Sequence, residues 1–128
     1  MGTDTDVALW KWLVRALGLV LLALGVAILL WPDLAAPLFA TTPSPGSERT
    51  YLRAIALRDV AIGLWLMVGA AISVRATAVS LAAVAVIPFG DLLLVALNHG
   101  SFIVFLPHAV SLIVTLGLAL WGRRLAER

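Results

Sequence analysis

Four ionisable residues lie inside long apolar stretches of the chain, where charge is rare: Arg58, Asp59, Asp91 and His108. Carboxylates and an imidazole are the usual groups for general acid and base catalysis, and burial and neighbouring charges can tune them for it. We therefore predict proton-transfer chemistry at these positions. Either Asp59 or Asp91 is the acid, His108 is the base or relay, and Arg58 holds one carboxylate ionised.

Other kinds of site have weaker support. The chain has no cysteine, which excludes thiol catalysis and thiolate metal sites. Its histidines and intramembrane aspartates lack the i, i+3 or i, i+4 spacing that preorganises a metal site, so we expect no metal. Nothing resembles a phosphate loop or a Ser-His-Asp order, and we expect no cofactor.

Membrane-spanning helices must position these residues. Of the 128 residues, 62% are hydrophobic and 12% are charged, and the mean hydropathy is +1.08. Soluble domains hold about 45 to 50% apolar and about 25% charged residues, so a water-soluble globule is excluded. A span takes about 20 apolar residues. We predict a single transmembrane domain over residues 1–128, with spans over 7–31, 51–73, 77–97 and 101–122. Short connections make this an all-α, integral membrane four-helix bundle.

The first connection is the longest. Pro32 ends the first span, residues 32–40 are predicted to form a short interfacial helix, and residues 41–47 are a loop by composition. Small residues within the spans predict close helix contacts, at Gly18, Gly25, Gly63 and Gly69.

Basic residues predict the orientation. In a four-span chain one face holds both termini and carries Lys11, Arg15, Arg75, Arg123, Arg124 and Arg128, whereas the other carries only Arg49 and Arg53. The positive-inside rule then places both termini in the cytoplasm, in a plasma (inner) membrane. Trp10, Trp12 and Trp121 are expected in the cytoplasmic interfacial belt and Trp31 in the outer one.

The same scatter of basic residues argues against nucleic acid as a partner. The net charge is +2, and no basic run is interleaved with exposed aromatic residues. The expected partners are the membrane and a lipophilic small molecule or lipid, and a homo-oligomer stays open.

The depths of the ionisable residues place them together. Arg58, Asp91 and His108 each lie roughly 9 to 10 Å below the outer end of their span at 1.5 Å per residue. An Arg or Asp at a helix centre costs roughly 2.5 to 3.5 kcal/mol on translocon-type scales. We therefore predict that these residues converge in one polar cluster inside the bundle.

Helical spacing predicts which other side chains face this cluster. Tyr51, Arg58 and Trp65 recur every seven residues and share a face, and His108, Ser111 and Thr115 form a polar stripe. We predict that Tyr51, Trp65, Ser111 and Thr115 bind substrate. For Trp65, packing is the more favoured alternative.

The pairing of the charges is expected to cross between helices. Neighbouring residues on a helix point about 100° apart, so Arg58 and Asp59 are not expected to face one another along it. We predict Arg58 with Asp91, and Asp59 with His108 or with the Arg58 head group. Two prolines close to these residues, Pro88 and Pro107, are expected to kink their helices and open a pocket.

A family resemblance rests on several of these residues. The run Arg58–Leu64, preceded by Pro32–Phe39 and followed by Asp91 and His108, resembles an uncharacterised family of small four-span proteins in bacteria and fungi. That family is distantly similar to the DoxX-like group. The resemblance covers about residues 18–124 and implies four transmembrane helices with polar residues at these positions. It implies no established activity.

Three functions remain open at this point. The leading hypothesis is a membrane enzyme of the isomerase, cyclase or epoxide-opening type that acts on a lipophilic small molecule. The second is a small proton-coupled transporter of lipophilic or cationic compounds, although a buried Arg opposes a cationic substrate. The third is a structural or accessory subunit in which the ion pairs only specify helix packing.

Overall fold

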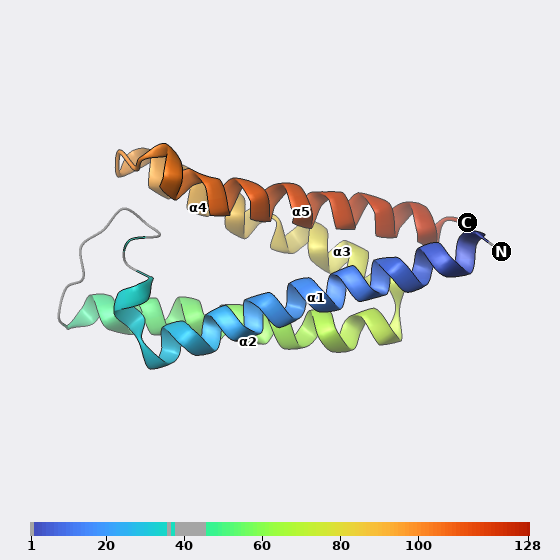
Figure 1. Ribbon diagram of the computed structural model, residues 1–128, viewed down its shortest axis with the longest axis horizontal. Coiled ribbons are helices and arrows are strands. Elements are labelled where there is room, and N and C mark those ends of the chain that lie inside the picture. Colours follow the sequence, from blue (N-terminus) through green and yellow to red (C-terminus); the bar gives the residue numbers. More distant parts are fainter. Residues whose placement is uncertain (1, 36, 38–45) are drawn as a thin grey trace.

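Long α-helices run back and forth along one axis of the molecule (Figure 1). The computed structural model describes residues 2–35, 37 and 46–128. The elements are α1 (Gly2–Leu30), η1 (Pro32–Leu34), α2 (Ser47–Ile72), α3 (Val74–Val84), α4 (Val86–Leu97) and α5 (Phe102–Ala126), where η1 is a 3-10 helix. No strand occurs in these described ranges. The prediction of an all-α four-helix bundle is confirmed, and α3 and α4 together form its third long segment.

The observed helices extend past the apolar stretches from which the spans were predicted. Helix α1 begins at Gly2 rather than near residue 7, and α5 continues to Ala126 rather than ending near residue 122. Backbone hydrogen bonding continues through charged turns that hydropathy alone leaves out. Of the predicted interfacial helix over residues 32–40, the turn Pro32–Leu34 and Pro37 have 3-10 helical conformation, and residues 36 and 38–40 lie outside the described residues. The predicted loop overlaps α2 at Ser47, and its residues 41–45 also lie outside them.

The third span is interrupted in its middle. Helix α3 ends at Val84 and α4 starts at Val86. Pro88 has no N–H to donate to the carbonyl of Val84, and its ring crowds that carbonyl, which accounts for the break three residues before the proline. The expected effect of Pro88 is therefore seen, whereas α5 remains one continuous helix through Pro107.

Helices α1 and α2 form a tightly packed antiparallel pair. A Cβ atom on Gly18 would lie 2.7 Å from the carbonyl oxygen of Gly63, and one on Gly25 would lie 2.7 Å from that of Ala56. Only glycine allows this separation of the two backbones. The predicted close contacts at these glycines are confirmed for Gly18, Gly25 and Gly63.

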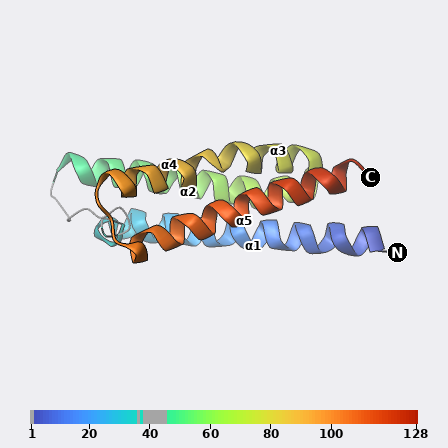
Figure 2. The same ribbon diagram turned by 90° about the horizontal axis from the view of Figure 1, so that it is seen from above.

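Helices α3, α4 and α5 form the second unit, and the two units come closest at the end of the molecule that holds both termini (Figure 1). The view from above also shows both termini at this one end (Figure 2). The main core lies at that end and draws on all of α1, α2, α3 and α5, including Trp10, Leu66, Leu81 and Leu118. A smaller apolar cluster, Ile28, Ala35 and Ala56, belongs to α1, α2 and the segment between them. Figure 1 shows the two units farther apart toward the opposite end.

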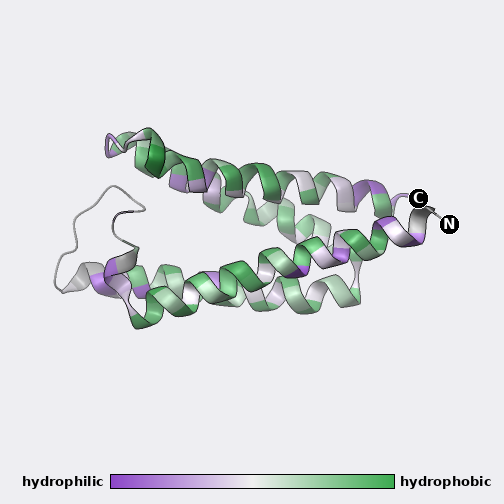
Figure 3. Cartoon of the chain, in the orientation of Figure 1, coloured by the Kyte–Doolittle hydropathy of each residue, from purple (hydrophilic) through white to green (hydrophobic). Residues whose placement is uncertain are grey.

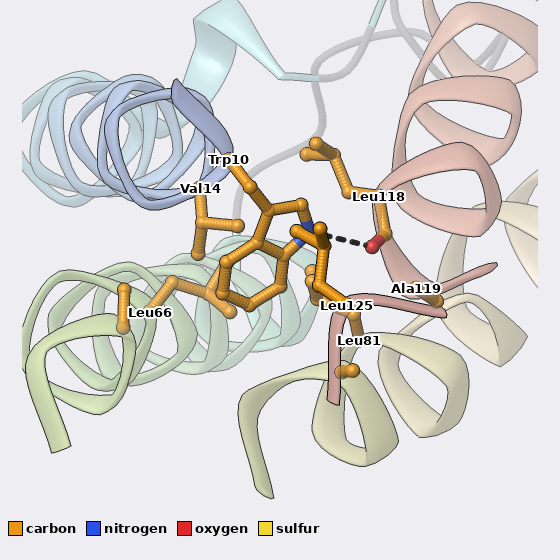
Figure 4. Packing of buried hydrophobic residues seen from close by; sticks show 9 residues of the cluster. Trp10, Val14, Leu66, Leu81, Leu118, Ala119 and Leu125 are labelled. Carbon is orange, nitrogen blue, oxygen red and sulfur yellow. Dashed lines mark hydrogen bonds between the residues drawn. The ribbon is translucent and has the colours of Figure 1, made fainter. Parts of the chain in front are cut away.

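Trp10 is the centre of the main core rather than part of an interfacial belt. Its indole is fully buried, and Nε1 donates a hydrogen bond of 2.8 Å to the carbonyl oxygen of Leu118 (Figure 4). A Cβ atom on Gly122 would lie 2.5 Å from the Trp10 ring, so this glycine makes the room for it. The belt prediction is wrong for Trp10. Trp12 and Trp31, by contrast, are exposed on the outside of the bundle.

Hydrophobic residues make up most of the length of the helices (Figure 3). Large hydrophobic side chains that face outward include Leu19, Val20, Val79, Phe89 and Ile113. Contiguous apolar surface of this extent is rare on soluble monomers and is what lipid contact requires. Within the described residues, four segments are long and apolar enough to cross a membrane: Asp4–Leu30, Arg49–Ile72, Val74–Leu97 and Phe102–Ala126. The chain is an integral membrane protein.

Candidate functional site

A partly enclosed cavity of about 130 Å³ lies between the two helical units, and all four spans contribute to its lining. Its polar residues are Arg58 and Asp59 from α2, Asp91 from α4, and His108, Ser111 and Thr115 from α5. Its apolar wall consists mainly of Leu21, Leu24, Ile28, Ile55, Ile62, Val84 and Ile87, with Pro88 and Pro107. The four ionisable residues therefore converge on one cavity, as predicted from their depths in the spans.

On α2, Arg58 turns back onto its neighbour. The Arg58 Nε atom donates to Oδ1 of Asp59 at 3.0 Å, and a terminal guanidinium nitrogen lies 3.0 Å from the same oxygen. The Asp59 side chain is 11% exposed and that of Arg58 is 34% exposed. The expectation that these neighbours cannot face one another is wrong, because the long Arg side chain bridges the 100° between them. The alternative of Asp59 with the Arg58 head group is the pairing observed.

On the other side of the cavity, Asp91 is paired with His108. Oδ2 of Asp91 lies 3.7 Å from Nδ1 of His108, and both side chains are largely buried. This separation suits an ion pair when the imidazole is protonated and is too long for a direct hydrogen bond. The predicted pairing of Arg58 with Asp91 is replaced by this contact between α4 and α5, although Arg58 stays within electrostatic range of Asp91.

Each carboxylate thus has its closest basic partner on the same helical unit. Asp59 and Arg58 both belong to α2, and Asp91 and His108 belong to the α3–α5 unit. Both pairs line the cavity. A molecule entering the cavity meets the Arg58–Asp59 ion pair and the Asp91–His108 pair.

Two hydroxyl groups extend the polar lining toward the main core. Thr115 Oγ1 donates a hydrogen bond of 2.7 Å to the carbonyl oxygen of Ser111, one turn earlier on α5. Its hydrogen is committed to the backbone, so toward the cavity the Thr115 oxygen can act only as an acceptor. Ser111 and Thr115 lie where the predicted stripe with His108 placed them.

The structure does not bring the two aromatic candidates to the cavity. Tyr51 is 69% exposed and Trp65 is 44% exposed, and neither contributes to the lining. They do share a face with Arg58, but that face lies at the border between the bundle interior and the outside, as the exposure of Arg58 shows. The buried neighbour Asp59 marks the inner face instead. Residues at helical spacing from Asp59, namely Ile55 and Ile62, lie on this inner face, and that spacing could have predicted the apolar wall on α2.

Metal binding finds no support in the part of the chain that the structure describes. No group of three or more His, Asp or Glu side chains lies close enough together there to hold an ion.

The fold and the cavity together define a small integral membrane protein that carries paired ionisable residues inside a four-helix bundle. The chain belongs to the family described as a domain of unknown function, DUF4267, which matches residues 18–122 and so includes every residue that lines the cavity. No curated protein and no solved structure matches the chain. Its more distant similarity to the DoxX-like group stays a prediction.

Proposed function

We propose that the protein is a membrane-embedded enzyme that transfers protons to and from a lipophilic small molecule, in an isomerisation, a cyclisation or an epoxide opening. The observation that supports this most is the pairing of Asp91 with His108 at the wall of a cavity inside the bundle. A carboxyl group and an imidazole in contact can hold one proton between them and give it to, or take it from, a substrate atom. The second pair, Arg58 and Asp59, supplies fixed charge on the opposite side.

The size of the cavity limits what enters it. A cavity of about 130 Å³ is similar to the engineered apolar cavities of about 150 Å³ that hold one benzene molecule. It therefore takes one ring or an equivalent portion of a substrate, and the rest of a larger molecule would remain in the surrounding lipid. This favours a substrate with a small reacting group on an apolar body.

The same observations favour the enzyme over a purely structural subunit and over a transporter of cationic compounds. A purely structural ion-pair network needs no space beside it, whereas here both pairs line a cavity. For a transporter of cations, the guanidinium of Arg58 in the lining would repel the substrate.

Co-purification tests the proposal. A small lipophilic molecule is expected to accompany the purified wild-type protein and to be lost from a Ser111→Leu variant, because leucine would fill part of the cavity. Ser80→Leu is the matched control, since Ser80 bonds to the carbonyl of Ala76 and lies away from the cavity. Extraction and mass spectrometry measure the bound molecule, and incubation in D₂O should introduce deuterium where the proton is exchanged. Equal amounts of the same lipids in all three proteins, with no deuterium uptake, would contradict the proposal.

We also propose that both termini lie in the cytoplasm and that the membrane is the plasma (inner) membrane. The end with the termini carries six of the Lys and Arg residues, against Arg49 and Arg53 at the opposite end. The chain has no cysteine, so single-cysteine variants label at one place only. Asn98→Cys is expected to react with a membrane-impermeant maleimide on intact cells, and Arg75→Cys only after lysis. The reverse pattern would show that the orientation is wrong.

A further inference from the structure

A second hollow lies on the outside of the bundle, between α3 and α5 at the end with the termini. This α3–α5 groove has a volume of about 610 Å³ and is separate from the polar cavity. It is lined by Arg75, Ala78, Val79, Ala82, Ala119, Leu120, Arg123, Ala126 and Glu127. Its volume falls within the range of about 300 to 1,000 Å³ that is typical of ligand sites.

The floor of the groove suits a hydrocarbon chain. Ala78 and Ala82 are one turn apart on α3, and Ala119 faces them from α5, so small side chains leave a channel parallel to the helices. Val79 and Leu120 are largely exposed and form apolar walls. The channel runs along the span, which is the direction in which an acyl chain lies in a bilayer.

The rim of the groove suits an anionic head group. Arg75 is the second residue of the third span and Arg123 lies in the last turn of α5, so both guanidinium groups are at the level where a helix leaves the hydrocarbon. Arg123 is bonded to Glu127 with an Nε to Oε1 distance of 2.9 Å, but both side chains are well exposed. Exposed i, i+4 pairs contribute little, so a phosphate can take the place of Glu127. Arginine also binds phosphate oxygens in a bidentate manner.

We propose that the α3–α5 groove binds one anionic phospholipid from the bilayer, with an acyl chain on the alanine floor and the phosphate between Arg75 and Arg123. In the orientation proposed above, this lipid comes from the cytoplasmic leaflet. Further basic side chains at this end, Lys11, Arg15 and Arg124, attract the same lipids to it.

Native mass spectrometry of the full chain tests the proposal after reconstitution in nanodiscs of equal parts phosphatidylglycerol and phosphatidylcholine. The wild-type protein is expected to retain one phosphatidylglycerol in preference to phosphatidylcholine. Combined Arg75→Gln and Arg123→Gln substitutions should lower that preference about 100-fold, at about tenfold for each charge-assisted contact with the phosphate that is lost. Glu127→Gln should raise it, because Arg123 loses its competing carboxylate.

Arg124→Gln is the matched control, since Arg124 is the neighbour of Arg123 on α5 but does not line the groove. It should change the preference little. Ala82→Phe fills the floor while leaving both arginines in place, and it should also abolish retention if the acyl chain lies there. Equal retention of the two lipids by the wild type would overturn the proposal. An equal loss with Arg124→Gln would also overturn it, because that result indicates a diffuse charge effect. A dimer in which a second copy covers the groove would overturn it as well.

Discussion

Replacement of Gly63 by alanine is expected to destabilise the protein by about 3 kcal/mol or more. The new Cβ atom would lie 2.6 Å from the carbonyl oxygen of Gly18 and 2.7 Å from the backbone nitrogen of Leu22. Both are backbone atoms of α1, so no change of side-chain rotamer can relieve the contact. The two helices would have to move apart along their whole interface.

Gly117→Ala is the matched control. Gly117 lies on α5, and a Cβ atom there would have no other atom within 4 Å. Alanine is favoured over glycine inside a helix by about 0.5 to 1 kcal/mol, so this variant should be slightly more stable than the wild type. Unfolding in mixed micelles, followed by circular dichroism, measures both. If Gly63→Ala were as stable as Gly117→Ala, α1 and α2 would not be in contact at Gly18.

The fold could be predicted because its main determinants are local. Apolar stretches of sufficient length define four spans, and glycines at helical spacing define where α1 and α2 approach each other. The position of Trp10 could not be predicted from local sequence. A tryptophan near the end of a span fits an interfacial belt by type and depth, but the glycine that makes room for it, Gly122, is 112 residues away in the chain. Only the packed structure brings these two together.

The candidate site, too, has features that the sequence predicts and features that only the packed structure determines. The depth of a residue along its span can be counted from the sequence, and it correctly predicted that the four ionisable residues lie at one cavity. Pairing depends on side-chain rotamers and helix rotation, which spacing does not determine. Arg58 could therefore turn back to Asp59, leaving Asp91 to His108. Helix rotation also decides that Tyr51 and Trp65 lie at the outer border of α2 rather than in the cavity.

The two buried carboxylates are expected to respond differently to replacement by asparagine. Asp59→Asn removes the charge that neutralises Arg58 and should destabilise the protein by about 3 kcal/mol. This is the lower end of the range for buried pairs, because the Arg58 side chain is 34% exposed. Asp91→Asn leaves His108, which can become neutral, so its loss of stability should stay below about 1 kcal/mol. A combined Arg58→Met and Asp59→Leu variant should recover most of the stability lost in Asp59→Asn. A large loss from Asp91→Asn alone would instead favour the structural role.

Turnover, unlike stability, is expected to depend strongly on Asp91 and His108. Asp91→Asn and His108→Gln nearly keep the volume and hydrogen bonding of the side chains but remove their capacity to transfer a proton. With the molecule that co-purifies as substrate, both should lower turnover by about 10² to 10⁴, the range for loss of a general acid or base. Ser80→Ala, which changes a hydroxyl bonded within α3 outside the cavity, should leave it unchanged. Because Asp91 and His108 act as one pair, the double variant should lose little more than either single variant. Folded Asp91→Asn and His108→Gln proteins with full turnover would exclude this pair as the site of proton transfer.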